Sequence, residues 1–167
     1  YTLYRNIGKA VQDIANKVQS TYIQNCLKYF FLRAKYDFIS LTPGRGEGNY
    51  SVYGYIGRKK IKFNYDGSER RTLIPQEMVE QLISTSAISA NDFKDSGEKI
   101  KLADGTKIFG TSFTLKELKI DDKVFTNVKC KMVESNELML GFSTFEKDYV
   151  DFEIKDSKIW LLKESEE

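Results

Sequence analysis

Histidine is absent from the 167 residues of this chain, and cysteine, proline and tryptophan are scarce. Without imidazole, catalysis by Ser-His or Cys-His pairs is excluded, and most zinc sites lose a common ligand. The two cysteines, Cys26 and Cys130, are too far apart for a metal-ligand spacing and too few for the disulfide framework of a small secreted domain. We therefore expect two free thiols and no metal site.

A dominant charge of one sign is also lacking, since 26 Lys and Arg face 24 Asp and Glu and leave a net charge of +2. Nucleic acid is not an expected partner, because such proteins present a strongly basic surface. No apolar run reaches the roughly 18–20 residues of a transmembrane segment, and no signal peptide is visible. The chain begins at Tyr1 rather than Met, so an upstream targeting or anchor segment stays open and the compartment is unknown.

Hydrophobic residues nevertheless make up 41% of the chain, which is enough to form a packed core. In residues 1–41 they recur in steps of three and four, which predicts an amphipathic helical extension with one long helix, or two with a break, over residues 3–35. We expect its apolar stripe to pack on the rest of the chain or on a partner helix rather than on a membrane. The stripe consists of Leu3, Ile7, Val11, Ile14, Val18, Tyr22, Cys26 and Tyr29.

Residues 42–49 are rich in Pro and Gly and are interpreted as a linker or exposed loop. The apolar period then changes to two, which predicts a mostly β domain over residues 50–163, followed by an acidic tail at residues 164–167. Pro75 is well placed to begin a short helix, and Asp104-Gly105 predicts a hairpin with a two-residue turn. Expected strands cover residues 50–56, 60–65, 112–119, 123–134 and 138–141, with two more in 151–162, and a second short helix is expected over 142–148.

Three pieces of this pattern, taken in order, resemble the retropepsin-like aspartic proteases of the single-lobe, homodimeric type. The first runs from Val52 to Asp66 and continues in Thr72-Leu73-Ile74-Pro75, the second is Leu102-Ala103-Asp104-Gly105-Thr106, and the third is Leu138-Met139-Leu140-Gly141-Phe142. The resemblance covers nearly all of residues 50–163. It implies a mostly β, retropepsin-like closed barrel, a single acid-protease lobe with one or two short helices, here preceded by the helical extension.

The resemblance also implies roles for individual residues. Asp66 falls on the catalytic position, and Gly67, Ser68 and Glu69 continue the active-site loop. Ala103, Asp104, Gly105 and Thr106 correspond to the flap that covers the substrate. Leu140 and Gly141 correspond to the apolar residue and the glycine that support the loop from behind.

The catalytic turn departs from the family, which has Asp-Thr/Ser-Gly where this chain has Asp66-Gly67-Ser68. Ser68 can supply a hydroxyl from the neighbouring position only if its Cβ fits, while Glu69 and Arg70 either crowd the cleft or pair with each other. Without the resemblance, these residues have simpler interpretations. Asp66-Gly67 can be the turn of a hairpin, Asp104-Gly105 can be an ordinary turn, and Gly141 can mark the end of a strand. Trp160 is expected in the core or in an interface.

The expected function is that of an aspartic endopeptidase in which two Asp66 carboxylates of a homodimer activate a water molecule. Its partners would be a second copy and a polypeptide substrate or peptide ligand, and no cofactor is implied. The alternative is an inactive retropepsin-like domain that serves in binding or assembly, with the helix as a docking element. A third interpretation is an unrelated small β-barrel binding module, in which Asp66 is an exposed turn residue.

Overall fold

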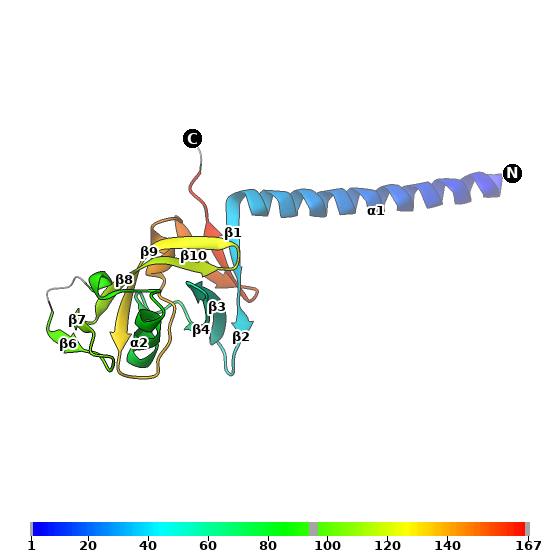
Figure 1. The fold of residues 1–167 in the computed structure, drawn as a ribbon. Coiled ribbons are helices and arrows are strands. Elements are labelled where there is room, and N and C mark those ends of the chain that lie inside the picture. The colour runs from blue at the N-terminus through cyan, green and yellow to red at the C-terminus, as the bar shows by residue number, and fades with distance from the viewer. Residues whose placement is uncertain (1, 94–96, 166–167) are drawn as a thin grey trace. The chain divides into compact units, whose positions relative to one another are not determined.

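The computed structural model of the protein describes residues 2–93 and 97–165, and the chain divides into two compact units between Asp37 and Phe38. The first unit consists mainly of α1 (Thr2–Lys35), a single helix of 34 residues (Figure 1). The helix therefore forms without the break that the sequence left open. Within this unit its apolar stripe is exposed, with Val11, Ile14 and Val18 each more than 60% accessible.

The second unit is mostly β, as predicted, and contains two short α-helices. Its elements are β1 (Tyr36–Ser40), β2 (Thr42–Pro43), β3 (Tyr50–Ile56), β4 (Lys59–Tyr65), β5 (Thr72–Pro75), α2 (Gln76–Ser84), a 3-10 helix (Ala90–Asp92), β6 (Lys99–Lys101), β7 (Lys107–Phe109), β8 (Ser112–Ile120), β9 (Lys123–Val133), α3 (Ser143–Glu146), β10 (Asp151–Lys155) and β11 (Lys158–Leu162).

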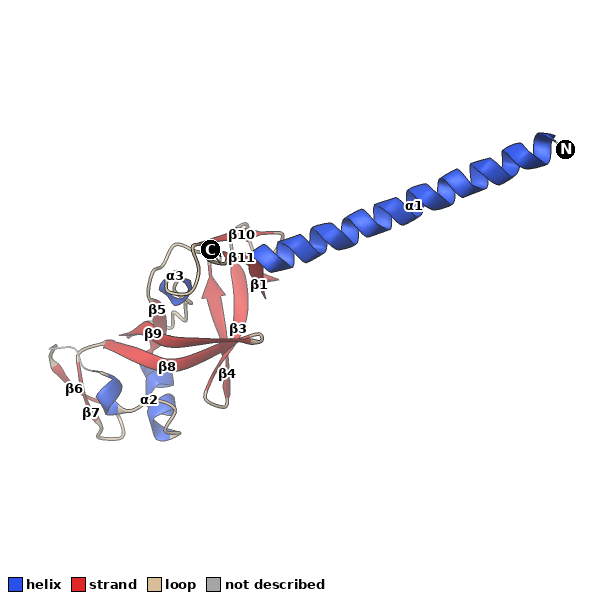
Figure 2. Ribbon diagram, turned by 90° about the horizontal axis from the view of Figure 1, so that it is seen from above, coloured by secondary structure: helices blue, strands red, loops and turns tan. Residues whose placement is uncertain are grey.

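The largest sheet has six strands in the order β2-β3-β8-β9-β5, with β4 paired to β3, and it curls into a half-barrel (Figure 2). β5 joins β9 in parallel, whereas β3 pairs antiparallel with β4 and with β8. A second sheet has the order β1-β11-β10, and β6 and β7 form a separate hairpin. The parallel β5–β9 pair means that the chain crosses the sheet between these strands instead of returning through a tight turn.

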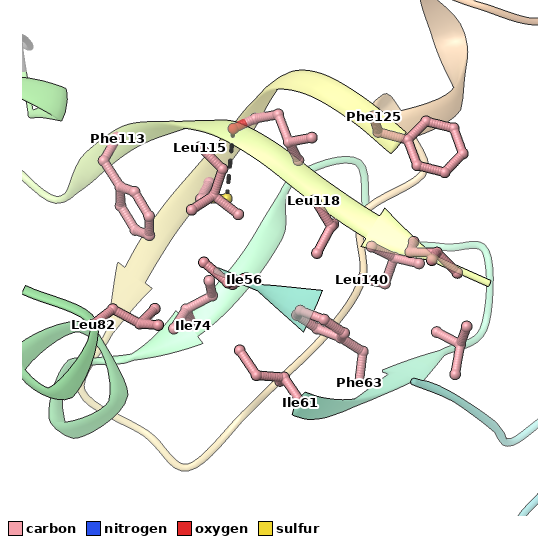
Figure 3. Close-up of a cluster of buried hydrophobic side chains, with 14 of the residues drawn as sticks. Ile56, Ile61, Phe63, Ile74, Leu82, Phe113, Leu115, Leu118, Phe125 and Leu140 are labelled. Atoms are coloured by element: carbon pink, nitrogen blue, oxygen red, sulfur yellow. Dashed lines mark hydrogen bonds between the residues drawn. The ribbon is translucent and has the colours of Figure 1, made fainter. Parts of the chain in front are cut away.

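The core lies inside the curl of the large sheet. Along β4 the buried Ile61, Phe63 and Tyr65 alternate with exposed Lys and Asn, as the period of two predicts. Buried side chains from β3, β5, β8, β9 and α2 converge on this row (Figure 3). The labelled members of the cluster are Ile56, Ile61, Phe63, Ile74, Leu82, Phe113, Leu115, Leu118, Phe125 and Leu140.

The long β8–β9 hairpin departs from simple alternation. In the first half of β8 the odd-numbered residues Phe113 and Leu115 are buried. After the two consecutive exposed residues Lys116 and Glu117, burial shifts to the even-numbered Leu118 and Ile120. β9 makes the same change across Asn127, whose φ of 53° lies in the left-handed region that Asn tolerates better than most residues. The two halves of the hairpin therefore present opposite faces to the core.

Two sequence expectations need correction here. Residues 36–40, placed in the helical extension, form β1, because Ile39 and Leu41 are buried in the core of the second unit. Residues 138–141 were expected to form a strand. They make only isolated bridges, because Met139 is the one residue of this segment that pairs, with Asn64 on one side and with Leu73 on the other. The domain boundaries proposed from the sequence stay a prediction.

Candidate functional site

The loop that carries Asp66 connects β4 to β5 and spans residues 66–71. β4 and β5 do not pair with each other, since β4 pairs with β3 and β5 pairs in parallel with β9. The interpretation of Asp66-Gly67 as the turn of a β4–β5 hairpin is therefore wrong. The Asp-Gly pair instead begins a loop between two strands that belong to different parts of the sheet.

The segment that contains Met139 ties both strands together. The Asn64 N–H donates to the Leu138 carbonyl at 2.8 Å, and the Leu140 N–H donates to the Asn64 carbonyl at 2.9 Å. Met139 and Leu73 exchange two backbone hydrogen bonds, at 2.8 and 3.0 Å. The two ends of the Asp66 loop are thus attached to one short segment, which holds the loop more firmly than either strand alone.

Gly141 lies directly behind the loop. A Cβ added to it would fall within 2.5 Å of backbone atoms of Arg70, Arg71 and Thr72, so no other residue fits without moving the main chain. The following Phe142 and Ser143 N–H groups donate to the Glu69 and Arg70 carbonyls, both at 2.9 Å. The structure therefore places Leu140 and Gly141 against the loop from behind.

Two threonines complete this support, and sequence reasoning gave neither of them a role. Thr72 is fully buried, and its Oγ1 accepts a hydrogen bond from the Gly141 N–H at 3.0 Å. The same oxygen lies 3.5 Å from Oγ1 of the buried Thr144. The only signal in the sequence was a threonine at the start of an apolar strand, and it indicates nothing about a partner 69 residues away.

Asp66 itself is exposed, and its carboxylate is held by its own loop. Oδ1 accepts one hydrogen bond from Ser68 Oγ at 2.6 Å and another from the Ser68 N–H at 2.8 Å. These bonds, the side-chain one first, lower the pKa of Asp66 below its ordinary value because they stabilise the charged form. Beside it, burial and the Asp66 charge raise the pKa of the Tyr65 hydroxyl to about 12.

Gly67 suits the backbone conformation of its loop. Gly67 has a φ of 79°, a value that L side chains rarely adopt and that a β-branched Thr adopts least readily. A Thr or Ser at this position would therefore be strained in this loop. The hydroxyl is present one residue later, because the Ser68 side chain reaches the Asp66 carboxylate.

Glu69 and Arg70 do not pair with each other. Glu69 Oε1 accepts a hydrogen bond from the Arg71 N–H at 3.3 Å, while Arg70 forms an exposed ion pair with Glu146 of α3, also at 3.3 Å. Both side chains are engaged at the rear of the loop, so the expectation of a mutual pair is wrong. The reason is tertiary, since α3 brings Glu146 closer than any partner within the loop.

An open pocket of about 350 Å³ lies beside Asp66. Its walls come from the β2–β3 connection, from the end of β4 and from Met139. Asp66 is the one acid and Arg45 the one base among the residues that line it. A second carboxylate for a two-aspartate site is therefore not contributed to this pocket by the described part of the chain.

The expected flap residues form the tip of the β6–β7 hairpin. The Leu102 N–H donates to the Thr106 carbonyl and the Gly105 N–H donates to the Leu102 carbonyl, which defines a three-residue loop. The predicted two-residue turn is wrong, because only Gly105, with a φ of 88°, takes the left-handed conformation. The Thr106 N–H donates to Asp104 at 2.9 Å and lowers the pKa of that carboxyl.

The structure does not bring this tip to Asp66. Ala103 donates its N–H to Glu80 of α2 at 3.4 Å, and no tip residue lines the pocket that contains Asp66. Within the described ranges there is no group of three or more metal-ligating side chains. None of the helices in those ranges combines the length and the apolar character that a membrane span requires.

No family model matches this chain, and no curated protein matches it either. The chain is similar in fold to a retropepsin-like aspartic protease from Rickettsia conorii, known from a crystal structure. The two are 19% identical, with a TM-score of 0.49, and the similarity covers 75% of this chain and 89% of that chain.

Proposed function

We propose that residues 50–163 form one retropepsin-like lobe of an aspartic endopeptidase, and that two copies of the chain build its active site. The observation that carries the proposal is the placement of Asp66. Its exposed carboxylate stands on a loop whose two ends are attached to Met139 and whose rear is closed by Gly141. A catalytic group needs this combination of access to substrate and fixed position.

A second copy is required because one carboxylate cannot be proton donor and proton acceptor in the same step. When two Asp66 side chains face each other, their repulsion raises the pKa of one of them, so the pair shares a proton. The ionised Asp66 takes a proton from water, whose oxygen attacks the peptide carbonyl carbon. The protonated Asp66 donates a hydrogen bond to the carbonyl oxygen and stabilises the charge that develops there.

Ser68 has a defined role in this scheme. Its two hydrogen bonds favour the charged form of Asp66, so they help one member of the pair to stay ionised at acidic pH. An extended polypeptide would bind beside the loop through backbone hydrogen bonds, as strands add to a sheet edge. Residues Ala103 to Thr106, which do not line the pocket at Asp66 in the single chain, would act as the flap only if the β6–β7 hairpin moves over the bound peptide.

A second candidate function is an inactive domain of the same fold that binds a peptide or supports assembly. The observation that favours it is the self-contained Asp66-Gly67-Ser68 turn, in which both Ser68 hydrogen bonds end on Asp66 Oδ1. In this arrangement the carboxylate stabilises its own loop and remains charged. Such a turn is structural in many proteins.

The test compares the unmodified chain with Asp66→Asn on a mixed peptide library at about pH 4 to 6, where a shared-proton pair works. We expect cleavage by the unmodified chain and a loss of at least about 100-fold in Asp66→Asn, because the base is removed. Light scattering on the same samples reports whether both proteins are dimers. Equal cleavage by both, or none by a chain that is dimeric, would contradict the enzyme proposal and favour the binding module.

A mixing experiment tests the two-copy site directly. Increasing amounts of Asp66→Asn are added to a fixed amount of the unmodified chain, and cleavage is measured after the subunits exchange. Mixed dimers hold one carboxylate, so activity should fall as they form. A constant rate would show that each chain works alone.

A further inference from the structure

A second open groove, of about 580 Å³, lies between the first half of β8, the facing part of β9, Arg71 and the 3-10 helix. We propose that this groove binds acidic side chains of a polypeptide, and so gives the proposed endopeptidase a preference for substrates with Asp or Glu near the cleaved bond. The claim that the bound polypeptide is a substrate rests on the proposed function. The claim that acidic side chains bind here rests on the groove alone.

The groove is built by strand geometry. Thr114 and Lys116 lie two residues apart on the same face of β8, and Lys129 of β9 stands directly opposite Thr114. The left-handed Asn127 is where the hairpin changes face, and it lines the groove next to them. The residues Phe113 and Cys130, both almost fully buried, form its floor.

Three cations line the groove: Arg71, Lys116 and Lys129. The one acid among the lining residues is Asp92, so the lining carries three positive charges against one negative, a net charge of +2. Asp92 is already engaged, since it accepts the Ser89 N–H at 2.8 Å in the capping box of the 3-10 helix. This hydrogen bond fixes the Asp92 carboxylate in the capping box, and its single negative charge leaves the groove with a net charge of +2.

The cations of the groove differ from others on the surface. Arg70 pairs with Glu146, Lys123 pairs with Asp122, and Lys60 lies over the Tyr53 ring. By contrast, within residues 2–93 and 97–165 neither Lys116 nor Lys129 has a hydrogen-bond or ion-pair partner, and Arg71 reaches only the neutral Ser112 hydroxyl, at 3.4 Å. The three cations of the groove outnumber its one carboxylate and repel one another, and an anionic ligand relieves this repulsion.

The position of the groove connects it to Asp66. Arg71 is the last residue of the loop that Asp66 begins, and five residues of chain span at most about 18 Å. An extended peptide advances by about 3.3 Å per residue. A carboxylate bound at Arg71 therefore belongs to a residue within about five or six positions of the peptide bond at Asp66.

Binding is tested on the full chain with Asp66→Asn, which holds peptide without cleaving it. Two fluorescent peptides differ only in that two Glu residues replace two Gln, and anisotropy gives their dissociation constants at low salt and at about 0.15 M. We expect the Glu peptide to bind about three to ten times more tightly, and the difference to shrink as salt rises. Equal affinity for the two peptides, or no binding of either, would overturn the proposal.

Variants separate the groove from general surface charge. Lys116→Gln with Lys129→Gln should bring the ratio of affinities close to one. The matched control, Lys62→Gln with Lys101→Gln, removes the same charge from exposed positions on β4 and β6 outside the groove and should leave the ratio unchanged. A control that loses as much discrimination would show a diffuse electrostatic effect and would refute a site at the groove.

Failure of this inference is distinguishable from failure of the proposed function. If the unmodified chain cleaves both peptides at the same rate, the endopeptidase stands and the acidic subsite is wrong. If the charge preference in binding depends on Lys116 and Lys129 but neither peptide is cleaved, the groove stands and the protease proposal is wrong. Cleavage that favours the Glu peptide in the unmodified chain, and loses this preference in the double variant, supports both.

Discussion

At the scale of single residues, the Asp66 loop depends on a few positions that each satisfy a different physical requirement. Gly141 is there because the backbone of residues 70–72 leaves no room for a Cβ. Gly67 has room, with its nearest neighbours 3.8 and 3.9 Å from an added Cβ, but it has a positive φ. Ser68 supplies the hydroxyl and the N–H that hold the carboxylate. The first is a packing requirement, the second a conformational one and the third electrostatic.

Gly141→Ala tests the packing requirement. The new Cβ must push the backbone of the loop aside, so we expect a loss of more than about 3 kcal/mol in the free energy of unfolding, measured by urea denaturation. Gly105→Ala is the control, because it has a positive φ but open space around it. It should cost only about 1 to 2 kcal/mol. Similar losses in the two variants would contradict a steric role for Gly141.

Ser68→Ala tests the electrostatic requirement. The substitution removes the hydrogen bond from the Ser68 hydroxyl to the Asp66 carboxylate. The pKa of Asp66 should therefore rise toward its ordinary value, and carboxyl NMR shifts can follow this during an acid titration. A carboxyl whose folded pKa is depressed contributes stability above its unfolded pKa and loses it as pH falls through the folded pKa. Ser68→Ala should therefore show a smaller decrease in stability on acidification. An unchanged Asp66 pKa would show that Ser68 does not hold the carboxylate.

At the scale of elements, the β8–β9 hairpin changes the face that it presents to the core part-way along its length. Its two halves bury opposite faces, and the change occurs where Asn127 adopts a left-handed conformation beside the exposed Lys116 and Glu117. This same change forms the rim of the cationic groove. Without this change of face, the apolar residues of one half of the hairpin would be exposed to water.

Asn127→Val should therefore destabilise the fold although the side chain is exposed. A β-branched residue in the left-handed region costs about 1 to 2 kcal/mol, which thermal or urea unfolding would detect. Asn127→Gly, which accepts this backbone conformation, should change stability by less than about 1 kcal/mol. If valine were tolerated as well as glycine, the face change would not depend on the conformation at residue 127.

At the scale of the whole molecule, the chain divides into a helix and a β unit with separate interiors. Among the residues whose burial the structure describes, 6–93 and 97–165, each buried hydrophobic side chain lies at position 39 or later, so the described core consists of residues of the second unit. An isolated helix of this kind gains stability mainly from what covers its apolar face. The β unit gains its stability from a core that spans β3, β4, β5, β8, β9 and α2.

Removal of residues 1–35 should consequently leave the β unit folded. We expect its melting temperature to change by no more than about 3 °C, since a loss of 1 kcal/mol in a domain of this size shifts it by a few degrees. Circular dichroism should show a cooperative transition with the helical signal of α1 removed. Loss of that transition would mean that α1 contributes to the stability of the β unit.

Much of this organisation follows from residue patterns that operate over short distances. The period of three to four predicted α1, the period of two predicted β4, and Pro75 correctly marked the start of α2. The role of Leu140 and Gly141 as support for the active-site loop came from the family resemblance and stays a prediction, although Gly141 does lie against the backbone of residues 70–72. Residue patterns missed Thr72 and Thr144, because a buried hydroxyl pair leaves no periodic trace in a sequence.

By itself, the sequence indicated α1, the mostly β character of the second unit and the absence of imidazole chemistry, because these depend on local periodicity and composition. The choice of Asp66 as the candidate carboxylate came from the family resemblance and stays a prediction. Only the tertiary structure decided that β4 and β5 are held apart and joined through Met139, that Arg70 binds Glu146, and that Arg71, Lys116 and Lys129 line one groove. The residues that meet in this way are far apart in the chain, with Arg71 at least 45 positions from either lysine of the groove, and no repeating pattern indicates which side chains meet over such a separation.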